Sequence, residues 1–233
     1  MAKTQMRFGI GAVLAALACT PVHAQDTQFL PEIDAHLKLN SDFRVYVQAK
    51  DDREGGDPQQ FTFGPSIRFY LKPLLRLKNI TLFDLDDAKQ RPLVLEGGYR
   101  IITAPNTPAE NRVLQAVTFH LPLVAAILLT DRNRADLDWE AGTFTWRYRN
   151  KLMLQRTVPI SSYHLIPYLA AEPFYESQYS KWSTTDLYAG CLFPMGKTVQ
   201  FDLYYEHENN TGKSPNRQNN FVGVALHLHF SSE

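Results

Sequence analysis

Hydrophobic and polar side chains alternate with a period of two in many segments of the chain. In residues 143–155, mostly apolar and aromatic side chains alternate with a second set that includes Arg147, Arg149 and Lys151. Successive side chains of a strand point to opposite faces, so this segment predicts a strand with one apolar and one charged face. Comparable segments cover residues 43–50, 125–140, 198–208 and 220–230, and others begin near Ile33, Phe61, Ile80, Pro92, Arg112, Tyr163 and Thr184.

These segments predict about twelve strands, within roughly ten to fourteen, and the weakest covers residues 79–85. A closed barrel of this size is too wide for one layer of apolar side chains to fill. We therefore predict an all-β fold, an antiparallel transmembrane β-barrel with a polar lumen and an apolar, lipid-facing outside. Aromatic residues near strand ends, among them Trp139 and Trp146, are typical of a membrane interface. The alternative is a soluble lipocalin-like barrel or β-sandwich, in which the same alternation has the reverse polarity.

Residues 1–24 have the features of a cleavable signal peptide. Two cations precede an apolar stretch at residues 8–18, which is too short to cross a bilayer as a helix. Small residues then precede the expected cleavage site after Ala24, so residues 25–233 are expected to form the barrel domain. Lipid modification of Cys19 is the alternative.

Composition narrows the possible functions and locations. Lys and Arg number 24 and Asp and Glu number 24, and the resulting net charge of +0 argues against a nucleic-acid partner. The longest later apolar run, residues 121–129, is about half as long as a transmembrane helix needs. Only Cys191 remains after cleavage, so no intrachain disulfide is expected. The expected location is the outer membrane of a Gram-negative bacterium, after export.

Charged side chains on the polar faces of two consecutive segments predict a charge ladder in the lumen. The segments join at a tight turn near Gly142, so opposite charges on the two strands are expected to attract. The ladder either stiffens the wall or forms an electrostatic constriction that selects solutes. Its members are Arg132, Arg134, Asp136, Asp138 and Glu140 on the first strand and Arg147, Arg149 and Lys151 on the second.

Histidines occur on the lumen faces of the last and the first predicted strands. His227 and His229 alternate near the C-terminus, and Asp34 and His36 share a face in the first strand. These strands are neighbours in a closed barrel, and imidazoles with a carboxylate can bind zinc or copper. A histidine pair two residues apart is a weak signal, and solvated lumen histidines are the simpler interpretation. The sequence therefore assigns no metal ligand and no cofactor.

The sequence offers little support for an enzyme. Glu206, His207 and Glu208 are consecutive, but alternation places His207 on the opposite face from both carboxylates. A barrel enzyme that modifies lipids needs an activated serine beside a histidine, and nothing in the sequence selects such a pair.

The segment around Tyr175 to Trp182 is expected to form a long outer loop and an external contact surface. Aromatic side chains beside a cation suit sugars or lipid headgroups. The alternative, which the sequence favours, is an interfacial belt that anchors the strand ends. The residues concerned are Tyr175, Tyr179, Lys181 and Trp182.

Several short strings along the mature chain carry a family resemblance. They include Gly98-Tyr99-Arg100, Asp131-Arg132-Asn133-Arg134 before Trp139, Trp146-Arg147-Tyr148-Arg149-Asn150, Lys181-Trp182-Ser183-Thr184-Thr185, and Tyr204-Tyr205-Glu206-His207. In these strings the chain resembles the outer-membrane family known as domain of unknown function 2490, from about Phe29 to Phe230. The resemblance implies an outer-membrane barrel and supplies no catalytic residues.

The final strand also resembles the C-terminal signal that the bacterial barrel-assembly machinery recognises, because it ends on the aromatic Phe230. The expected partners are therefore this machinery, periplasmic chaperones and outer-membrane lipids, with no nucleic acid. The leading hypothesis is a passive channel or envelope structural component with a charged lumen. The alternatives are a lipid-modifying enzyme at the membrane interface and a binding protein that uses its loops.

Overall fold

The computed structural model describes residues 27–54, 57–71, 85–161, 163–212 and 214–231. The signal peptide expected over residues 1–24 lies outside these ranges and stays a prediction. The same is true of nearly all of the strand expected over residues 79–85.

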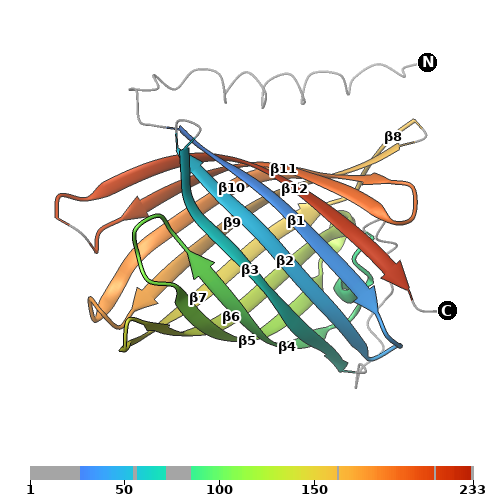
Figure 1. The fold of residues 1–233 in the computed structure, drawn as a ribbon. Helices are drawn as coiled ribbons and strands as arrows, with labels where there is room; N and C mark the ends of the chain where they lie inside the picture. The colour runs from blue at the N-terminus through green and yellow to red at the C-terminus, as the bar shows by residue number, and fades with distance from the viewer. Residues whose placement is uncertain (1–26, 55–56, 72–84, 162, 213, 232–233) are drawn as a thin grey trace, which may run out of the picture.

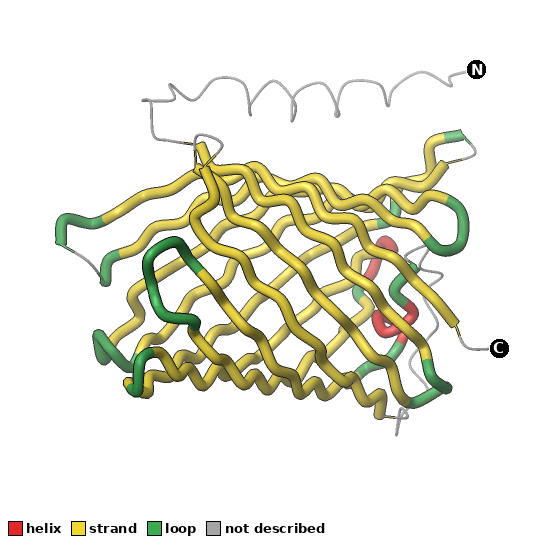
Figure 2. Tube along the Cα trace, viewed as in Figure 1, coloured by secondary structure: helices red, strands yellow, loops and turns green. Residues whose placement is uncertain are grey.

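Long β-strands make up most of the described chain (Figures 1 and 2). The eleven long strands of the described residues are β1 (Thr27–Lys38), β2 (Phe43–Glu54), β3 (Asp57–Leu71), β4 (Leu93–Thr103), β5 (Glu110–Pro122), β6 (Ile127–Glu140), β7 (Thr143–Arg156), β9 (Tyr163–Glu176), β10 (Lys181–Met195), β11 (Val199–Asn210) and β12 (Arg217–Ser231). The remaining elements are the short strand β8 (Val158–Ile160) and the 3₁₀ segments η1 (Asp87–Gln90) and η2 (Val124–Ala126). Within the described ranges, no helix has the length and apolarity that crossing a membrane requires.

The eleven long strands close into a barrel, which confirms the predicted fold class. Each pairs antiparallel with the next, and β8 is an extra strand that pairs only with β9. The closing pair is different: β1 and β12 run parallel, from Thr27 opposite Asn220 to Lys38 opposite Ser231 (Figure 1).

The parallel closure follows from the odd number of wall strands. Strands that alternate in direction bring the first and eleventh into the same orientation, so their ladder must be parallel. We expected about twelve strands, all antiparallel. Because β3 pairs directly with β4, the described wall has eleven strands, and the barrel is mixed rather than wholly antiparallel.

The start of β1 and the end of β12 lie at opposite rims of the barrel, which we call the N-terminal rim and the C-terminal rim. The C-terminal rim holds the end of β12 and the connections at residues 39–42, 85–92 and 123–126. The N-terminal rim holds the start of β1 and the turns at residues 141–142 and 177–180. The chain therefore enters and leaves the wall at opposite rims.

The polarity of the wall is inverted relative to a soluble barrel. In β1, the outward side chains of Phe29 and Ile33 are 46% and 53% exposed, whereas the inward Asp34 and His36 are buried. The same pattern recurs along the other long strands, where large apolar groups point outward and charged groups point inward. A soluble barrel would bury the apolar faces instead, so this observation excludes the lipocalin-like alternative.

A proline interrupts the hydrogen-bond ladder between β3 and β4, and an arginine side chain donates to carbonyl oxygens at that place. Pro65 in β3 has no amide hydrogen, and the β3–β4 pairing skips from Phe63 to Ser66. The buried Arg100 of β4 donates from Nη1 to the carbonyl oxygens of Pro65 at 2.8 Å and Tyr99 at 2.9 Å. The guanidinium therefore satisfies carbonyl groups at the place where the regular ladder is broken.

Candidate functional site in the charged lumen

The barrel encloses a cavity of about 590 Å³ that extends between its two rims. Every one of the eleven long strands contributes to the lining. Asp52 and Glu208 line it near the N-terminal rim, and Lys89 and His229 line it near the C-terminal rim. Because strands alternate, the inward faces alone decide the chemistry of this space.

One sector of the lumen, formed by β5, β6 and β7, is cationic. Asp136, the most buried acid of this sector, pairs with Arg134 Nε at 2.6 Å. It also lies 3.7 Å from Arg147 Nε and 3.6 Å from Arg149 Nε. The basic lining residues are Arg112, Arg132, Arg134, Arg147, Arg149 and Lys151. The acids Glu110, Asp138 and Glu140 of the same strands line a smaller hollow at the N-terminal rim instead.

The register of the β6–β7 hairpin differs in part from the expected ladder. Its two-residue turn sets Asp136 opposite Arg147, so these two opposite charges attract each other across the ladder. However, Arg134 lies opposite Arg149, and Arg132 lies opposite Lys151, so these cations do not face acids across the ladder. The expected attraction between opposite charges therefore applies to Asp136 and Arg147 and not to these two positions, because the turn fixes the register.

The other two acids of the predicted ladder occupy different environments. Asp138 lies opposite Thr145 but still approaches Arg147 Nη2 at 3.4 Å, and it accepts from Arg112 Nε at 2.7 Å. Glu140 lies opposite Thr143 and is exposed at the N-terminal rim. Glu140 therefore belongs to the mouth of the lumen rather than to its wall.

Some cations of this sector form ion pairs with glutamates on strands outside the β6–β7 hairpin. Glu96 of β4 lies 3.1 Å from Arg68 Nε and 3.4 Å from Arg132 Nη2. Glu172 of β9 lies 3.4 Å from Arg149 Nε and 3.7 Å from Lys151 Nζ. The sequence reasoning missed both glutamates because it considered one hairpin, although alternation alone places both side chains on the inward face.

A second sector, formed by β9 to β12 with β1, is acidic. The acids that line the cavity there are Glu172, Glu176, Asp186, Asp202, Glu206 and Glu208, with Glu32 and Asp34 from β1. Among the described residues of β9 to β12, neither Lys nor Arg lines the cavity. The lumen wall therefore has a basic side and an acidic side, and this separation of charge creates an electric field across the bore. The strands β2 to β4 carry both signs of charge: Lys50, Arg68 and Arg100 line the cavity there with Asp52 and Glu96.

A connection at the C-terminal rim folds into the mouth of the lumen. Asp86 accepts from Arg44 Nη1 at 2.7 Å and lies 3.8 Å from Arg68 Nη1. Burial alone would raise the pKa of the Asp86 carboxyl, but the two guanidiniums hold this pKa far below its usual value. His120 Nδ1 contacts the Arg91 carbonyl oxygen at 2.7 Å and fixes the other end of the connection. Residues 85–92 thereby narrow this entrance.

The expected outer loop around Tyr175 is a short turn with strand ends on either side. Only residues 177–180 form the turn, because β9 continues to Glu176 and β10 begins at Lys181. The expected loop was therefore too long. The long strands of this hairpin extend the ladder to the rim, where Lys181 pairs with Glu176.

The aromatic side chains of this hairpin pack on the outside of the barrel. Tyr175 stacks on Trp146 with ring centroids 5.5 Å apart, and its ring meets Trp182 edge-on at 5.8 Å. Lys181 Nζ donates to the Thr211 carbonyl oxygen at 2.7 Å, and Tyr179 packs against Gly212. These contacts hold the residues in one cluster at the N-terminal rim, which suits a belt of aromatic side chains.

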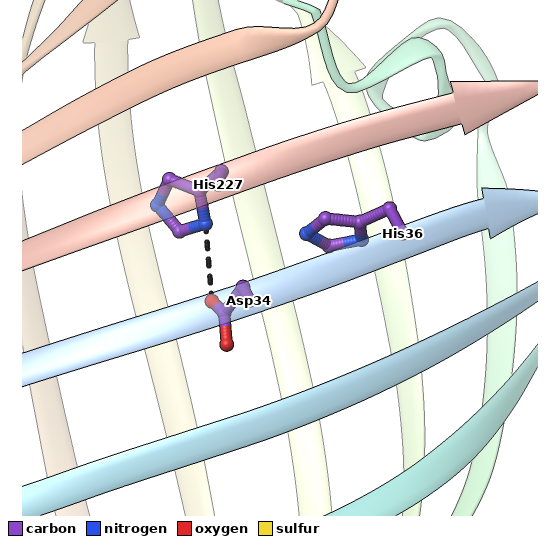
Figure 3. A group of neighbouring side chains, drawn as sticks. All are labelled: Asp34, His36 and His227. Atoms are coloured by element: carbon purple, nitrogen blue, oxygen red, sulfur yellow. Dashed lines mark ion pairs between the residues drawn. The ribbon is translucent and has the colours of Figure 1, made fainter.

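The parallel seam brings together the histidines of the first and last strands (Figure 3). Asp34 lies opposite His227, and His36 lies opposite His229. His227 Nδ1 lies 3.0 Å from Asp34 Oδ2, and the other carboxylate oxygen accepts from Tyr46 at 2.9 Å. Asp34, His36 and His227 each offer a ligand atom, and these atoms lie within 4.8 Å of one another.

The consecutive Glu206, His207 and Glu208 do not converge. Both glutamates line the cavity, whereas His207 Nδ1 contacts Asn220 Oδ1 at 2.8 Å. Alternation separates the imidazole from the two carboxylates, as the sequence predicts.

The wall and its lining define a closed β-barrel with an apolar outside and a divided, charged lumen. The chain belongs to the family described as "Protein of unknown function (DUF2490)", whose model matches residues 27–219. This match confirms the resemblance drawn from the sequence. No curated protein matches the chain.

A solved structure described as "Bacterial polysaccharide outer membrane secretin" has a similar fold. The TM-score is 0.51 and the sequence identity is 8%, over 78% of this chain. The chain covers 63% of that protein, so it spans less than two thirds of the neighbour's length. At this identity the likeness concerns the fold alone, and it is compatible with an outer-membrane barrel.

Proposed function

We propose that this chain is an outer-membrane barrel of a Gram-negative bacterium and acts as a passive channel for small charged solutes. The apolar outside supports insertion into lipid, since a wall of this polarity would expose a large hydrophobic surface to water. The aromatic cluster at the N-terminal rim supports an interfacial position for that rim.

The division of the lumen into a basic and an acidic side carries the channel proposal. Charged linings select ions in pores by interacting directly with the passing solute. Here the cavity reaches both rims, β5 to β7 line it with cations, β9 to β12 line it with acids, and β2 to β4 contribute both. A solute with both charges would orient in the field between the sectors, and the connection at residues 85–92 would restrict its size.

Conductance of the purified protein in planar bilayers tests this proposal. We expect steady current steps whose reversal potential in a salt gradient depends on the lumen charges. Lys151→Gln removes a cation and is expected to shift selectivity toward cations, whereas Glu208→Gln is expected to shift it toward anions. Leu203→Ala is the control because its side chain is 51% exposed on the outside. Folded protein without current, or equal reversal potentials in all variants, would contradict the channel.

The location has a separate test. N-terminal sequencing of protein recovered from the outer-membrane fraction is expected to begin at Gln25, as cleavage after Ala24 predicts. Recovery from the soluble periplasmic fraction would contradict the proposed location, whatever the result of the conductance experiment.

A further inference from the structure

The seam between β1 and β12 contains a cluster of metal-ligating side chains, of which the channel proposal uses only the charge of Asp34. Asp34 and His36 come from β1, and His227 comes from β12 (Figure 3). They are brought together only by the parallel closure of the barrel, since almost the whole chain separates the two strands. We propose that these three residues bind one divalent transition-metal ion of the zinc class at the seam.

The donor set fits this class of metal. Two imidazole nitrogens and one carboxylate oxygen suit zinc and its neighbours, whereas calcium and magnesium prefer oxygen ligands alone. Ligands of a tetrahedral zinc lie roughly 3.3 Å apart, since each bond is about 2.0 Å long. The present ligand atoms lie within 4.8 Å of one another. Rotation of the imidazole rings about their soft χ2 torsions can close this difference.

His36 supplies a second, independent observation. Its side chain is buried, and its Nδ1 atom has no hydrogen-bond partner among the described residues. A buried polar atom without a partner costs free energy. No hydrogen bond from a described residue to Nδ1 fixes the tautomer of the ring, so the imidazole can offer a lone pair to a metal ion. The His36 ring lies between two neighbours, Tyr46 at 4.8 Å and His229 at 4.7 Å, and this packing holds it beside Asp34.

The surroundings supply the outer contacts that a metal ligand needs. The Tyr46 hydroxyl donates to Asp34 Oδ1 at 2.9 Å and orients the carboxylate. The nearby Arg68 guanidinium, which lies over the Tyr46 ring at 4.5 Å, is itself paired with Glu96. Glu96 therefore partly compensates the charge of Arg68, which reduces the repulsion between this guanidinium and a bound metal ion.

Three protein ligands leave at least one coordination position open toward the lumen. All three side chains line the cavity, so the open position faces the aqueous space rather than lipid. Water or an anionic solute group would occupy it. The ion would also connect the first strand to the last one and so stabilise the closure of the barrel.

Calorimetric titration of the purified, folded protein with Zn²⁺ tests the site. We expect saturable binding of one ion, and His36→Gln and His227→Gln are each expected to weaken it by at least about tenfold. Tyr46→Phe is expected to weaken binding less, because it removes only the outer contact to Asp34. His120→Gln is the matched control, since His120 is a buried lumen histidine outside the cluster.

A second measurement keeps the inference testable if a variant folds poorly. Titration of the wild-type protein with Co²⁺ is expected to give visible absorption bands of a site with nitrogen ligands, and Zn²⁺ is expected to remove them by competition. Absence of saturable Zn²⁺ heat, equal binding by all variants, or equally tight binding of Ca²⁺ would overturn the site. The outcome does not depend on conductance, so the metal site and the channel fail or succeed separately.

Discussion

At the scale of single residues, the lumen is organised around acids that each serve several cations. Asp136 is the clearest case, because it is fully buried and has Arg134, Arg147 and Arg149 within 4 Å. Like charges at such distances repel strongly where water is excluded, and the carboxylate offsets that repulsion. Removing one acid therefore affects a group of arginines rather than one ion pair.

Asp136→Asn is expected to lower the free energy of unfolding by about 3–5 kcal/mol, because three guanidiniums lose their shared carboxylate. Urea unfolding of the protein folded into lipid vesicles measures this change. Arg134→Gln added to Asp136→Asn is expected to recover part of the loss, since it relieves the repulsion. A loss below about 1 kcal/mol would show that the arginines do not depend on Asp136.

The stability that Asp86 contributes is expected to depend on pH. Its carboxyl has a depressed pKa because Arg44 and Arg68 stabilise the charged form. Its contribution is therefore present above the unfolded-state pKa of about 3.9 and is lost as the pH falls below that value. Asp86→Asn is expected to cost about 2 kcal/mol at pH 7, and the difference from wild type is expected to shrink below about pH 4.

Unfolding curves at pH 7 and at pH 3 measure the difference between the two proteins. A difference that stays constant over this range would contradict the account of Asp86, because the ionised carboxylate would then have no part in holding the connection at residues 85–92.

At the scale of elements, strand register and close strand contact depend on a few special positions. Pro65 breaks the β3–β4 ladder, and the two strands approach closely beside it. A Cβ atom at Gly64 would collide with the Tyr99 carbonyl oxygen and lie 2.9 Å from Arg100 Cα. Gly97 on the neighbouring strand points outward, and a Cβ atom there would meet none of the described residues within 4 Å.

Gly64→Ala is expected to destabilise the barrel by about 1–3 kcal/mol, because backbone atoms of β4 would have to move. Gly97→Ala is the matched control and is expected to stabilise it by about 0.5 kcal/mol, since alanine restricts the unfolded chain. Equal effects of the two substitutions in urea unfolding would contradict the close approach of β3 and β4.

The elements themselves follow from the sequence, but several contacts between them do not. Alternation is a local property, so it located the eleven long strands and placed Arg147 and Arg149 on the inward face. The partner of Arg149 could not be found in the same way. Glu172 reaches it because β7 pairs with β9 past the short β8, and this pairing depends on the whole sheet.

At the scale of the whole molecule, the direction of the closing strand pair depends on whether the number of wall strands is odd or even. The sequence could not settle this, because one weak segment at residues 79–85 decides between eleven and twelve. With eleven strands, Phe29 lies opposite Val222, and Phe230 lies opposite Leu37. The same closure places Asp34 beside His227, a contact that depends on the parallel register.

Disulfide formation tests the parallel seam. In a protein with Cys191→Ser, the pair Phe29→Cys and Val222→Cys is expected to cross-link on mild oxidation. The control pair Phe29→Cys and Phe230→Cys is expected to remain reduced, because eight residues of strand, about 26 Å, separate the two positions. Cross-linking of the second pair and not the first, seen on non-reducing gels, would show that the strands close in the opposite sense.

The inverted polarity of the wall is the claim on which the proposed membrane location depends, and the native tryptophans report it directly. All three of them, Trp139, Trp146 and Trp182, are outward-facing and between 41% and 55% exposed near the N-terminal rim. Fluorescence of the protein in vesicles is the measurement, with brominated lipid chains and aqueous iodide as quenchers. We predict strong quenching by bromines placed high on the acyl chains and weak quenching by iodide. Strong quenching by iodide with none from the lipid would contradict a lipid-facing wall.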